Sequence, residues 1–485
     1  MPASYMTMFP PVQSALETMK LNVQFRANTL RQISKTCSLG CELWKTNIDI
    51  GLQTVRNLYS LCLPWWREQC DLIVDCYSSS ARNMLQLGQD YLVSGLDRMY
   101  ESRMGEADFL QLLSEEPPEQ DWSVEYDESR IILDLPSMRV IDFSLDTEHE
   151  ISNYTVVFAP RAGHHSNIAE RAALFMRDRG LTRLAVVEQK CAQDVPLFVN
   201  GERHHEDFDG QVEQYRRILE CLKERTGHPS HLVAICQPGP LLMSTLILHP
   251  HLGKTFGCAG SPMDTEGEEG VLTDFARTVG GEYMDLMVDL YGRVVGDEFP
   301  GAGRRIYDGR LQVFGFYLLG MQQHMRNLRQ LLQDLRQGNE ESAQRQKTFY
   351  QWYNTVNHAP EGFIRDTFKK VFVNNELVNG ELEIGGRKIG IRDYPAGVPA
   401  WALGGSRDEI TPPRQATGHM EYLDQVPAED RLTLICEGGH MGLFRSSRVL
   451  RDYYSRIVDF LLQRSNRARG ELEGSEESEH EVELE

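Results

Sequence analysis

The stretch His231–Leu248, HLVAICQPGPLLMSTLIL, decides the fold of this 485-residue chain. Its first six residues form a short, unbroken apolar run, which is typical of a buried strand in a parallel sheet. A helix-like apolar run follows at once behind Pro238, and proline suits the first turn of a helix because its missing N–H is not needed there. Cys236 therefore stands at a sharp corner between a strand and a helix. A cysteine at such a corner is either a small core residue or the nucleophile of an enzyme.

Strand and helix patterns alternate on both sides of this corner. Such repeated β-α units predict a mostly parallel sheet with helices on both faces, which is an α/β fold and more narrowly an α/β-hydrolase fold. A hairpin near Pro136 precedes the alternation. The predicted strands are 155–160, 184–189, 231–236, 254–260, 398–405 and 431–439, and the main helices are 167–180, 211–227 and 449–465.

Two further regions extend or interrupt this core. The N-terminal region has few glycines and shows apolar residues at helical spacing, which predicts amphipathic helices broken at Pro64. A long helical, aromatic segment interrupts the core and is predicted to be a cap or lid. The acidic C-terminal tail is predicted to be disordered. The predicted regions are 1–105 (N-terminal helices), 106–125 (linker), 126–274 (core, first part), 275–394 (cap), 395–466 (core, second part) and 467–485 (tail).

Composition narrows the classes of partner and compartment. The formal net charge of -21 argues against nucleic acid and anionic membranes as partners, since both need a basic surface. The N-terminal segment MPASYMTMFPPVQ lacks the features of a secretory signal, and no apolar run approaches the roughly 18 residues of a membrane span. The 10 cysteines include no CxxC pair, which favours reduced thiols and a cytoplasmic protein.

Two loops further along the chain offer partners for Cys236. Asp408, in GSRDEITPP, follows one predicted strand, and His440, in GGHMGLF, follows the next. An α/β-hydrolase carries its nucleophile, acid and histidine in this order, each at the C-terminal end of a strand. The predicted roles are attack on an acyl carbonyl by Cys236, proton transfer by His440 and orientation of the imidazole by Asp408. Asp264 also ends a predicted strand and is a reserve candidate for the acid.

The oxyanion of such a reaction needs backbone donors. The N–H of Gln237, next to the nucleophile, is one predicted donor, and Arg161 or Ala162 in the loop after strand 155–160 supplies the second. His164 and His165 are assigned to a turn, because no cluster with metal-ligand spacing surrounds them. No glycine-rich phosphate-binding pattern follows a strand, so neither a metal nor a nucleotide cofactor is expected.

Several blocks, among them HLVAICQPGPLL, FPGAGRRIYDGRLQVFGF and FYQWYNTVNHAPEGFIRDTFKKVF, resemble the intracellular poly(3-hydroxybutyrate) depolymerases. The resemblance runs from about Glu125 to Ser465, with the blocks in order. It implies a cysteine, aspartate and histidine triad, which falls on Cys236, Asp408 and His440. It also implies cleavage of the polyester of amorphous storage granules into 3-hydroxybutyrate oligomers or monomers, and a cytoplasmic, granule-associated location.

The chain departs from that family at two places that border the expected cleft. Gly239 and Pro240 follow the Cys-Gln-Pro box at once, where the family carries a further residue or two before its next proline. The sequence VVEQKCAQDVP stands where the family tends to carry Thr-Asp-Trp. These departures make substrate length less predictable than the fold.

Two other functions stay open. A polyhydroxyalkanoate synthase resembles this chain in fold and in using a cysteine, but its box has glycine two residues after the cysteine, where Pro238 stands here. A non-catalytic granule protein would keep the hydrolase fold for binding and use the N-terminal helices as an anchor. Trp65 and Trp66 fit such an anchor and fit core packing equally well. Water and coenzyme A are alternative acceptors of the acyl group.

Overall fold

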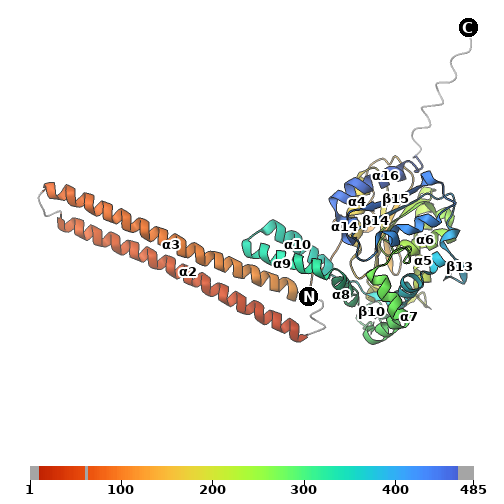
Figure 1. Ribbon diagram of the computed structural model, residues 1–485, viewed down its shortest axis with the longest axis horizontal. Helices are drawn as coiled ribbons and strands as arrows, with labels where there is room; N and C mark the ends of the chain where they lie inside the picture. Colours follow the sequence, from red (N-terminus) through yellow and green to blue (C-terminus); the bar gives the residue numbers. More distant parts are fainter. Residues whose placement is uncertain (1–9, 60–63, 468–485) are drawn as a thin grey trace, which may run out of the picture. The chain divides into compact units, whose positions relative to one another are not determined.

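A computed structural model describes residues 10–59 and 64–467, and the chain divides into two compact units. The first unit holds the residues up to Pro118 together with Gln322–Asn354. The second holds Glu119–Met321 and the residues from Thr355 onward, and its elements can be followed in Figure 1. The predicted tail lies outside the described residues apart from its first position.

An eight-stranded sheet forms the centre of the second unit, in the order β1-β2-β4-β3-β7-β8-β14-β15. β2 pairs antiparallel with both of its neighbours, and every other neighbouring pair in this sheet is parallel. This order is that of the α/β-hydrolase fold, so the predicted fold class is confirmed. The strands are β1 Ile131–Asp134, β2 Met138–Asp142, β3 Thr155–Phe158, β4 Leu184–Gln189, β7 Ser230–Ile235, β8 Gly253–Ala259, β14 Ala400–Gly405 and β15 Arg431–Cys436.

Helices cover both faces of this sheet, as Figure 1 shows. On one face lie α4 (Glu170–Asp178), α14 (His440–Arg445) and α16 (Ser455–Leu462), and on the other α5 (Phe208–Thr226) and α6 (Gly239–Leu248). The inner strands are therefore apolar and buried along their whole length, as β3, β7 and β14 show.

Close packing inside the sheet depends on one glycine in particular. A Cβ atom on Gly257 of β8 would lie 1.8 Å from the ring of Trp401 on β14. The side chain of Trp401 is fully buried, so it fills the space that a side chain at position 257 would need. The sequence pattern predicts both strands, but it does not reveal this pairing of glycine with tryptophan.

Two long helices, α2 (Pro10–Tyr59) and α3 (Pro64–Ser114), form a hairpin in the first unit together with α9 (Met321–Gln337) and α10 (Glu340–Asn354). The predicted break at Pro64 is confirmed, because α3 begins there. The linker predicted at 106–125 is shorter, because α3 continues to Ser114. Helical spacing of apolar residues persists to Leu113, and Gly105 lets α3 approach α9 so closely that a Cβ would lie 2.2 Å from the Leu335 carbonyl oxygen.

The insertion predicted as one cap at 275–394 is divided between the two units, since Gln322–Asn354 groups with the N-terminal helices. It also begins earlier, at Val271, and contains short strands. The hairpin turn at Gly385 and Gly386 uses positive φ angles of 56° and 78°. These elements are α7 Val271–Tyr291, β9 Arg293–Val294, β10 Arg305–Tyr307, α8 Gly309–Leu319, β11 Ala359–Pro360, α11 Glu361–Asp366, α12 Glu376–Asn379, β12 Leu382–Ile384 and β13 Arg387–Ile389.

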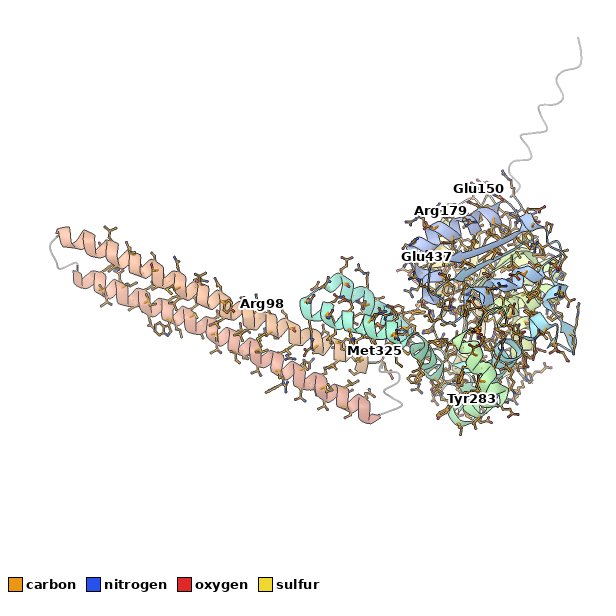
Figure 2. The ribbon with its side chains drawn as sticks, in the orientation of Figure 1. Arg98, Glu150, Arg179, Tyr283, Met325 and Glu437 are labelled. Carbon is orange, nitrogen blue, oxygen red and sulfur yellow. The ribbon has the colours of Figure 1, made fainter. Side chains whose placement is uncertain are left out.

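Apolar side chains stand out from α2 and α3 into solvent (Figure 2). Phe25, Trp44 and Leu87 are 72%, 66% and 70% exposed. The side chains of Trp65 and Trp66 lie outside the described residues. Among the helices that the structure describes, none has both the length and the apolar character needed to cross a membrane.

Candidate active site

Cys236 follows the last residue of β7 and has a positive φ angle of 64°. A residue other than glycine in this region is uncommon and stores strain on the order of 1–3 kcal/mol. The N–H of Cys236 donates to the carbonyl of Ala259 at the end of β8 (2.9 Å), which holds the corner in place. The thiol is half-buried, so it can be reached at the end of the sheet. The predicted strand-to-helix corner is confirmed.

The residues behind the cysteine explain the unusual Gly239-Pro240 sequence. Pro238 has a φ of -61°, so the position two residues after the cysteine needs no glycine in this chain. Gly239 does need to be glycine, because a Cβ there would lie 2.5 Å from the Cβ of Ser261 and 2.6 Å from the sulfur of Met263. The glycine thus serves the close approach of α6 to the loop after β8.

The structure brings Cys236, Asp408 and His440 together. His440 Nε2 lies 3.2 Å from Cys236 Sγ, and His440 Nδ1 lies 2.8 Å from Asp408 Oδ2. Asp408 Oδ1 accepts the backbone N–H groups of Ile410 and Thr411, both at 2.9 Å, which fixes the carboxylate and leaves Oδ2 for the imidazole. Asp408 and His440 are only 5% and 3% exposed, so their contact is shielded from water.

Two opposing effects set the pKa of His440. Burial alone would lower it, but the Asp408 carboxylate and the Cys236 sulfur raise the pKa of His440 well above 6.5. The charged form of the imidazole is therefore favoured, so His440 can hold a proton next to the Cys236 sulfur.

Phe444 and Gly260 lie next to the imidazole ring of His440 and limit where it can lie. Phe444 contacts it edge-on, with the ring centroids 5.2 Å apart. Gly260, just after β8, has a φ of 58°, and a Cβ there would lie 3.3 Å from His440 Cε1 and 2.9 Å from a methyl of Leu443. A glycine is therefore required behind the ring of His440.

The two predicted oxyanion donors lie at the site in different states. The backbone N–H of Gln237 donates to no acceptor among the described residues. The backbone N–H of Arg161 is occupied, since it donates to the side-chain carbonyl oxygen of Gln237 at 2.9 Å. The side chain of Gln237 thus links the two predicted donors.

Arg161 is anchored through its side chain by a buried ion pair that sequence reasoning missed. Its Nη1 lies 2.5 Å from Glu206 Oε2, and both residues are buried. Its Nη2 donates to the carbonyls of Ser137 (3.3 Å) and Lys190 (3.1 Å). Burial would raise the pKa of Glu206, but Arg161 and His204 outweigh it and lower the pKa to about 2.

Asp264, the reserve candidate for the acid, lies elsewhere. Its Oδ1 accepts from Asn375 Nδ2 at 3.0 Å, and its Oδ2 accepts from the hydroxyl of Tyr422 at 3.3 Å. Its carboxylate therefore ties the loop after β8 to the insertion. The acid that contacts His440 is Asp408.

The adjacent histidines of the loop after β3 contact different partners, His164 on α8 and His165 within its own turn. His164 stacks on Phe316, with ring centroids 5.9 Å apart, and His165 accepts the N–H of Asn167 at 3.2 Å. Among the residues that the structure describes, no group of His, Cys, Asp or Glu side chains could hold a metal ion.

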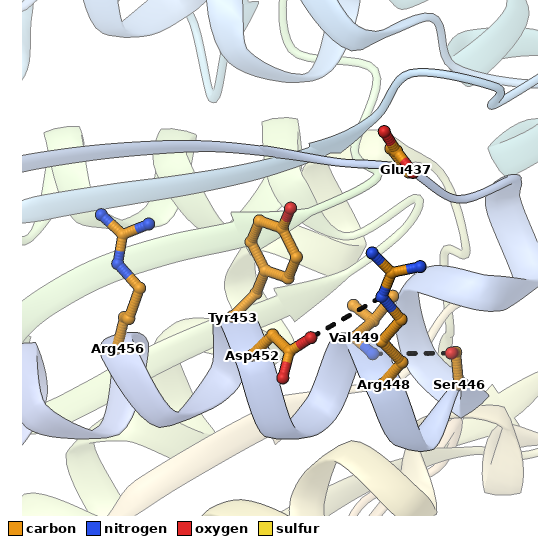
Figure 3. A pocket seen from close by; sticks show the side chains of 7 residues that line it. All are labelled: Glu437, Ser446, Arg448, Val449, Asp452, Tyr453 and Arg456. Atoms are coloured by element: carbon orange, nitrogen blue, oxygen red, sulfur yellow. Dashed lines mark hydrogen bonds and ion pairs between the residues drawn. The ribbon is translucent and has the colours of Figure 1, made fainter.

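A surface hollow of about 250 Å³ lies beside the last helices (Figure 3). Its walls carry both signs of charge, with Arg448 Nε 3.7 Å from Asp452 Oδ2, and none of the three triad side chains lines it. It is therefore a polar surface feature separate from the thiol. Its lining residues are Glu437, Ser446, Arg448, Val449, Asp452, Tyr453 and Arg456.

Comparison with known proteins gives matches of two kinds to the sequence. A family described as "PHB de-polymerase C-terminus" matches residues 260–465. The poly(3-hydroxyalkanoate) polymerase subunit PhaC of Allochromatium vinosum is 25% identical over 282 residues, covering 56% of this chain and 72% of that protein. The PhaC of Haloarcula marismortui is 22% identical over 283 residues, covering 58% of this chain and 54% of that protein. The chain thus spans about half the length of the archaeal relative.

Solved structures also match part of this chain, at low sequence identity. A monoacylglycerol lipase of Paleococcus ferrophilus is 13% identical and covers 68% of this chain and 99% of its own, with a TM-score of 0.36. The meta-cleavage product hydrolase CumD of Pseudomonas fluorescens is 12% identical and covers 67% and 94%, with a TM-score of 0.35. The assignment of the fold is based on the strand order of the sheet and not on these structural matches. The sequence matches make the chain similar to proteins of polyhydroxyalkanoate metabolism, and the curated relatives among them are polymerases.

Proposed function

We propose that this chain transfers hydroxyalkanoyl groups of polyhydroxyalkanoates through a thioester on Cys236. The observation that carries the proposal is the continuous contact from Cys236 through His440 to Asp408 at the carboxyl end of the sheet. A sulfur beside an imidazolium is a nucleophile at neutral pH, and a carboxylate behind the imidazole holds its orientation and its charge. The sequence matches supply the class of acyl group.

The reaction proceeds in two halves at the same sulfur. The Cys236 thiolate attacks the acyl carbonyl, and the negative charge that develops on its oxygen is stabilised by the backbone N–H groups of Gln237 and Arg161. As the tetrahedral intermediate collapses, His440 gives its proton to the leaving oxygen or sulfur and the acyl group stays on Cys236 as a thioester. His440, now neutral, then takes a proton from the acceptor, which attacks the thioester and releases the thiolate.

The direction of net transfer is the finer question, and synthesis is the first candidate. The curated relatives are polymerase subunits, so the donor would be a coenzyme A thioester and the acceptor the hydroxyl at the end of a polyester chain. The absence of glycine two residues after the cysteine does not stand against a synthase. Pro238 has an ordinary φ of -61° and leaves the corner intact.

Chain cleavage is the second candidate, and it is the function that the motifs predicted. It is supported by the family match over residues 260–465, whose description names a depolymerase. In this direction the donor is the polyester, and the acceptor is water or coenzyme A. Both directions imply a protein that works on polyester granules, which we propose to be cytoplasmic.

A paired assay separates the two directions. The full chain is given 3-hydroxybutyryl-coenzyme A in one reaction and amorphous poly(3-hydroxybutyrate) granules in the other, with and without coenzyme A. Release of free coenzyme A together with polymer supports synthesis, whereas release of hydroxybutyrate or its thioester from granules supports cleavage. Cys236→Ala should abolish either activity. If the wild-type chain is inactive in both reactions but sediments with granules, the non-catalytic alternative replaces the proposal.

A further inference from the structure

We infer that the side chain of Gln237 occupies the oxyanion site in the resting protein and has to be displaced by the substrate carbonyl. The inference rests on the proposed function. Its observation is the hydrogen bond from the Arg161 N–H to Gln237 Oε1, an amide carbonyl oxygen, at 2.9 Å. An amide carbonyl there stands in for the acyl carbonyl that the same N–H would bind during the reaction.

The partner that has to move is Gln237, because Arg161 is fixed. The guanidinium of Arg161 is buried in an ion pair with Glu206 and donates to two backbone carbonyls, so the loop that carries its N–H is anchored from below. The side chain of Gln237, in contrast, is half-buried and makes no other hydrogen bond with the described residues. Rotation of this side chain breaks one hydrogen bond and exposes the Arg161 N–H.

This arrangement has a benefit and a cost. In the absence of substrate, the amide satisfies a buried N–H that would otherwise lack an acceptor. When substrate arrives, its carbonyl competes with the amide of Gln237. The apparent dissociation constant of the substrate is then the intrinsic constant divided by the fraction of molecules in which the site is open. The maximal rate of acyl transfer is unaffected, because the amide has already left when the oxyanion forms. Gln237 is thus a positioning residue whose removal changes half-saturation rather than the chemical step.

The test measures acylation of Cys236 by a soluble 4-nitrophenyl ester as a burst of nitrophenol. Gln237→Met keeps the length of the side chain but removes the carbonyl. It should lower the half-saturating ester concentration about three- to tenfold, the factor of one neutral hydrogen bond, with the maximal burst rate within about twofold. Gln237→Glu should raise that concentration, because a carboxylate accepts the N–H more strongly. Gln463→Met, at an exposed position just after α16, is the control for the same chemical change.

Two further measurements separate the inference from a general disturbance of the site. Alkylation of Cys236 by iodoacetamide forms no oxyanion, so its rate should be equal in the wild type and Gln237→Met. Hydrogen exchange of the Arg161 amide should become faster in Gln237→Met. If Gln237→Met leaves the half-saturating ester concentration unchanged, the inference is overturned. A fall in its maximal burst rate also overturns the inference, because it would make the side-chain amide part of the catalytic machinery. Absence of any burst in the wild type contradicts the proposed function instead, and unchanged Arg161 exchange would still count against the inference.

Discussion

At the scale of single residues, the site combines a strained backbone with a buried charge pair. Cys236 holds a left-handed conformation, and the Asp408 carboxylate and the Cys236 sulfur together raise the pKa of His440 against the effect of burial. Both features need exact neighbours: the Ala259 carbonyl at the corner and the two N–H groups on Asp408 Oδ1. Each can be tested by one substitution.

Asp408→Asn removes the charge that raises the pKa of His440 but keeps the shape of the side chain. The pKa of His440 should therefore fall, because only the Cys236 sulfur then opposes the effect of burial. We expect acyl transfer to drop by about 10²- to 10⁴-fold. The pH dependence of iodoacetamide alkylation of Cys236 measures the change. Asp424→Asn, at an exposed position, should leave that profile unchanged.

The same pair carries a pH dependence of stability. The folded-state pKa of His440 is raised above its unfolded value near 6.5, so its contribution is complete below about pH 6.5 and is lost as the pH rises through the folded-state value. Unfolding in urea between pH 6 and 9 should show the wild type losing this contribution. Asp408→Asn should show a smaller loss, because only the Cys236 sulfur still raises the pKa of His440. Parallel curves for the two proteins would contradict the charge pair.

Gly260→Ala tests the glycine behind the histidine. An alanine at a φ of 58° should cost about 1–3 kcal/mol of unfolding free energy. Its Cβ would also meet Leu443 and His440, so the rate of acyl transfer should fall with the displaced ring. Gly397→Ala is the matched control, because nothing lies within 4 Å of its Cβ position and its φ is not positive. Equal stabilities of the two variants in urea would show that Gly260 has no special role.

At this scale the sequence predicted some members of the site and not others. Cys236, Asp408 and His440 could be found because each follows an apolar strand, and parallel strands bring their carboxyl ends to one edge of the sheet. Glu206 could not, because it lies in a loop 45 positions from Arg161 and no periodic pattern connects the two. The Gln237 side-chain contact with Arg161 depends on a rotamer, which a sequence pattern does not contain.

At the scale of elements, the loop after β3 is anchored by the buried ion pair between its own Arg161 and Glu206, a residue of another loop. The pair positions an N–H that the proposed reaction uses, so it connects the stability of a loop with the rate of acyl transfer. Its energetic weight follows from burial, since an ion left without its partner in the interior is costly.

Glu206→Gln leaves the Arg161 guanidinium without its charge partner in the interior. We expect a loss of about 3–5 kcal/mol in unfolding free energy and a slower burst of acylation. The pH dependence has a defined sign. The pKa of Glu206 is lowered from 4.5 to about 2, so its contribution is present above about pH 4.5 and is lost as the pH falls toward 2. Wild-type stability should fall more steeply over that range than that of the variant.

Glu213→Gln is the matched control for this prediction. Glu213 lies on α5 and pairs with Arg216 at the surface, where an ion pair contributes about 0–1 kcal/mol. The variant should therefore unfold within that margin of the wild type at every pH. If Glu206→Gln lowers the unfolding free energy as little as Glu213→Gln does, the buried pair does not anchor the loop.

Elements were predictable where their residues repeat with a clear period. The six mutually parallel strands of the central sheet were predicted, because β-α alternation leaves short apolar runs between helical patterns. The end of α3 and the division of the cap were not predictable from the sequence. Both depend on contacts between residues far apart in the chain, such as Gly105 and Leu335, which are separated by 230 positions. The short strands β9 to β13 have too few residues to show alternation.

At the scale of the whole molecule, the second unit, which contains the central sheet and is called here the hydrolase unit, carries the proposed chemistry. The first unit, called here the helical unit, has no assigned role. Its long helices expose many large apolar side chains. A polyester surface offers a matching apolar partner, and we expect the helical unit to contribute to granule binding.

Joint substitution of Phe25, Trp44 and Leu87 by Gln tests that expectation. Each side chain can contribute about 1.5–3 kcal/mol when buried, so co-sedimentation with amorphous granules should weaken more than about tenfold. Acyl transfer to soluble substrates should stay unchanged. Arg98→Gln on α3 is the control at another exposed position. Point substitutions are preferable to deletion, since removal of α3 would uncover the α9 backbone beside Gly105. Unchanged sedimentation would leave granule contact to the hydrolase unit.

The central claim is that the acyl group passes through the sulfur of Cys236. The most direct measurement is peptide mass analysis of the full chain, acid-quenched shortly after mixing with 3-hydroxybutyryl-coenzyme A. The account predicts one hydroxybutyryl group on the peptide that contains Cys236, removed by hydroxylamine and missing in Cys236→Ala. Product formation with no acyl group on this peptide, or with the acyl group on another residue, would contradict it.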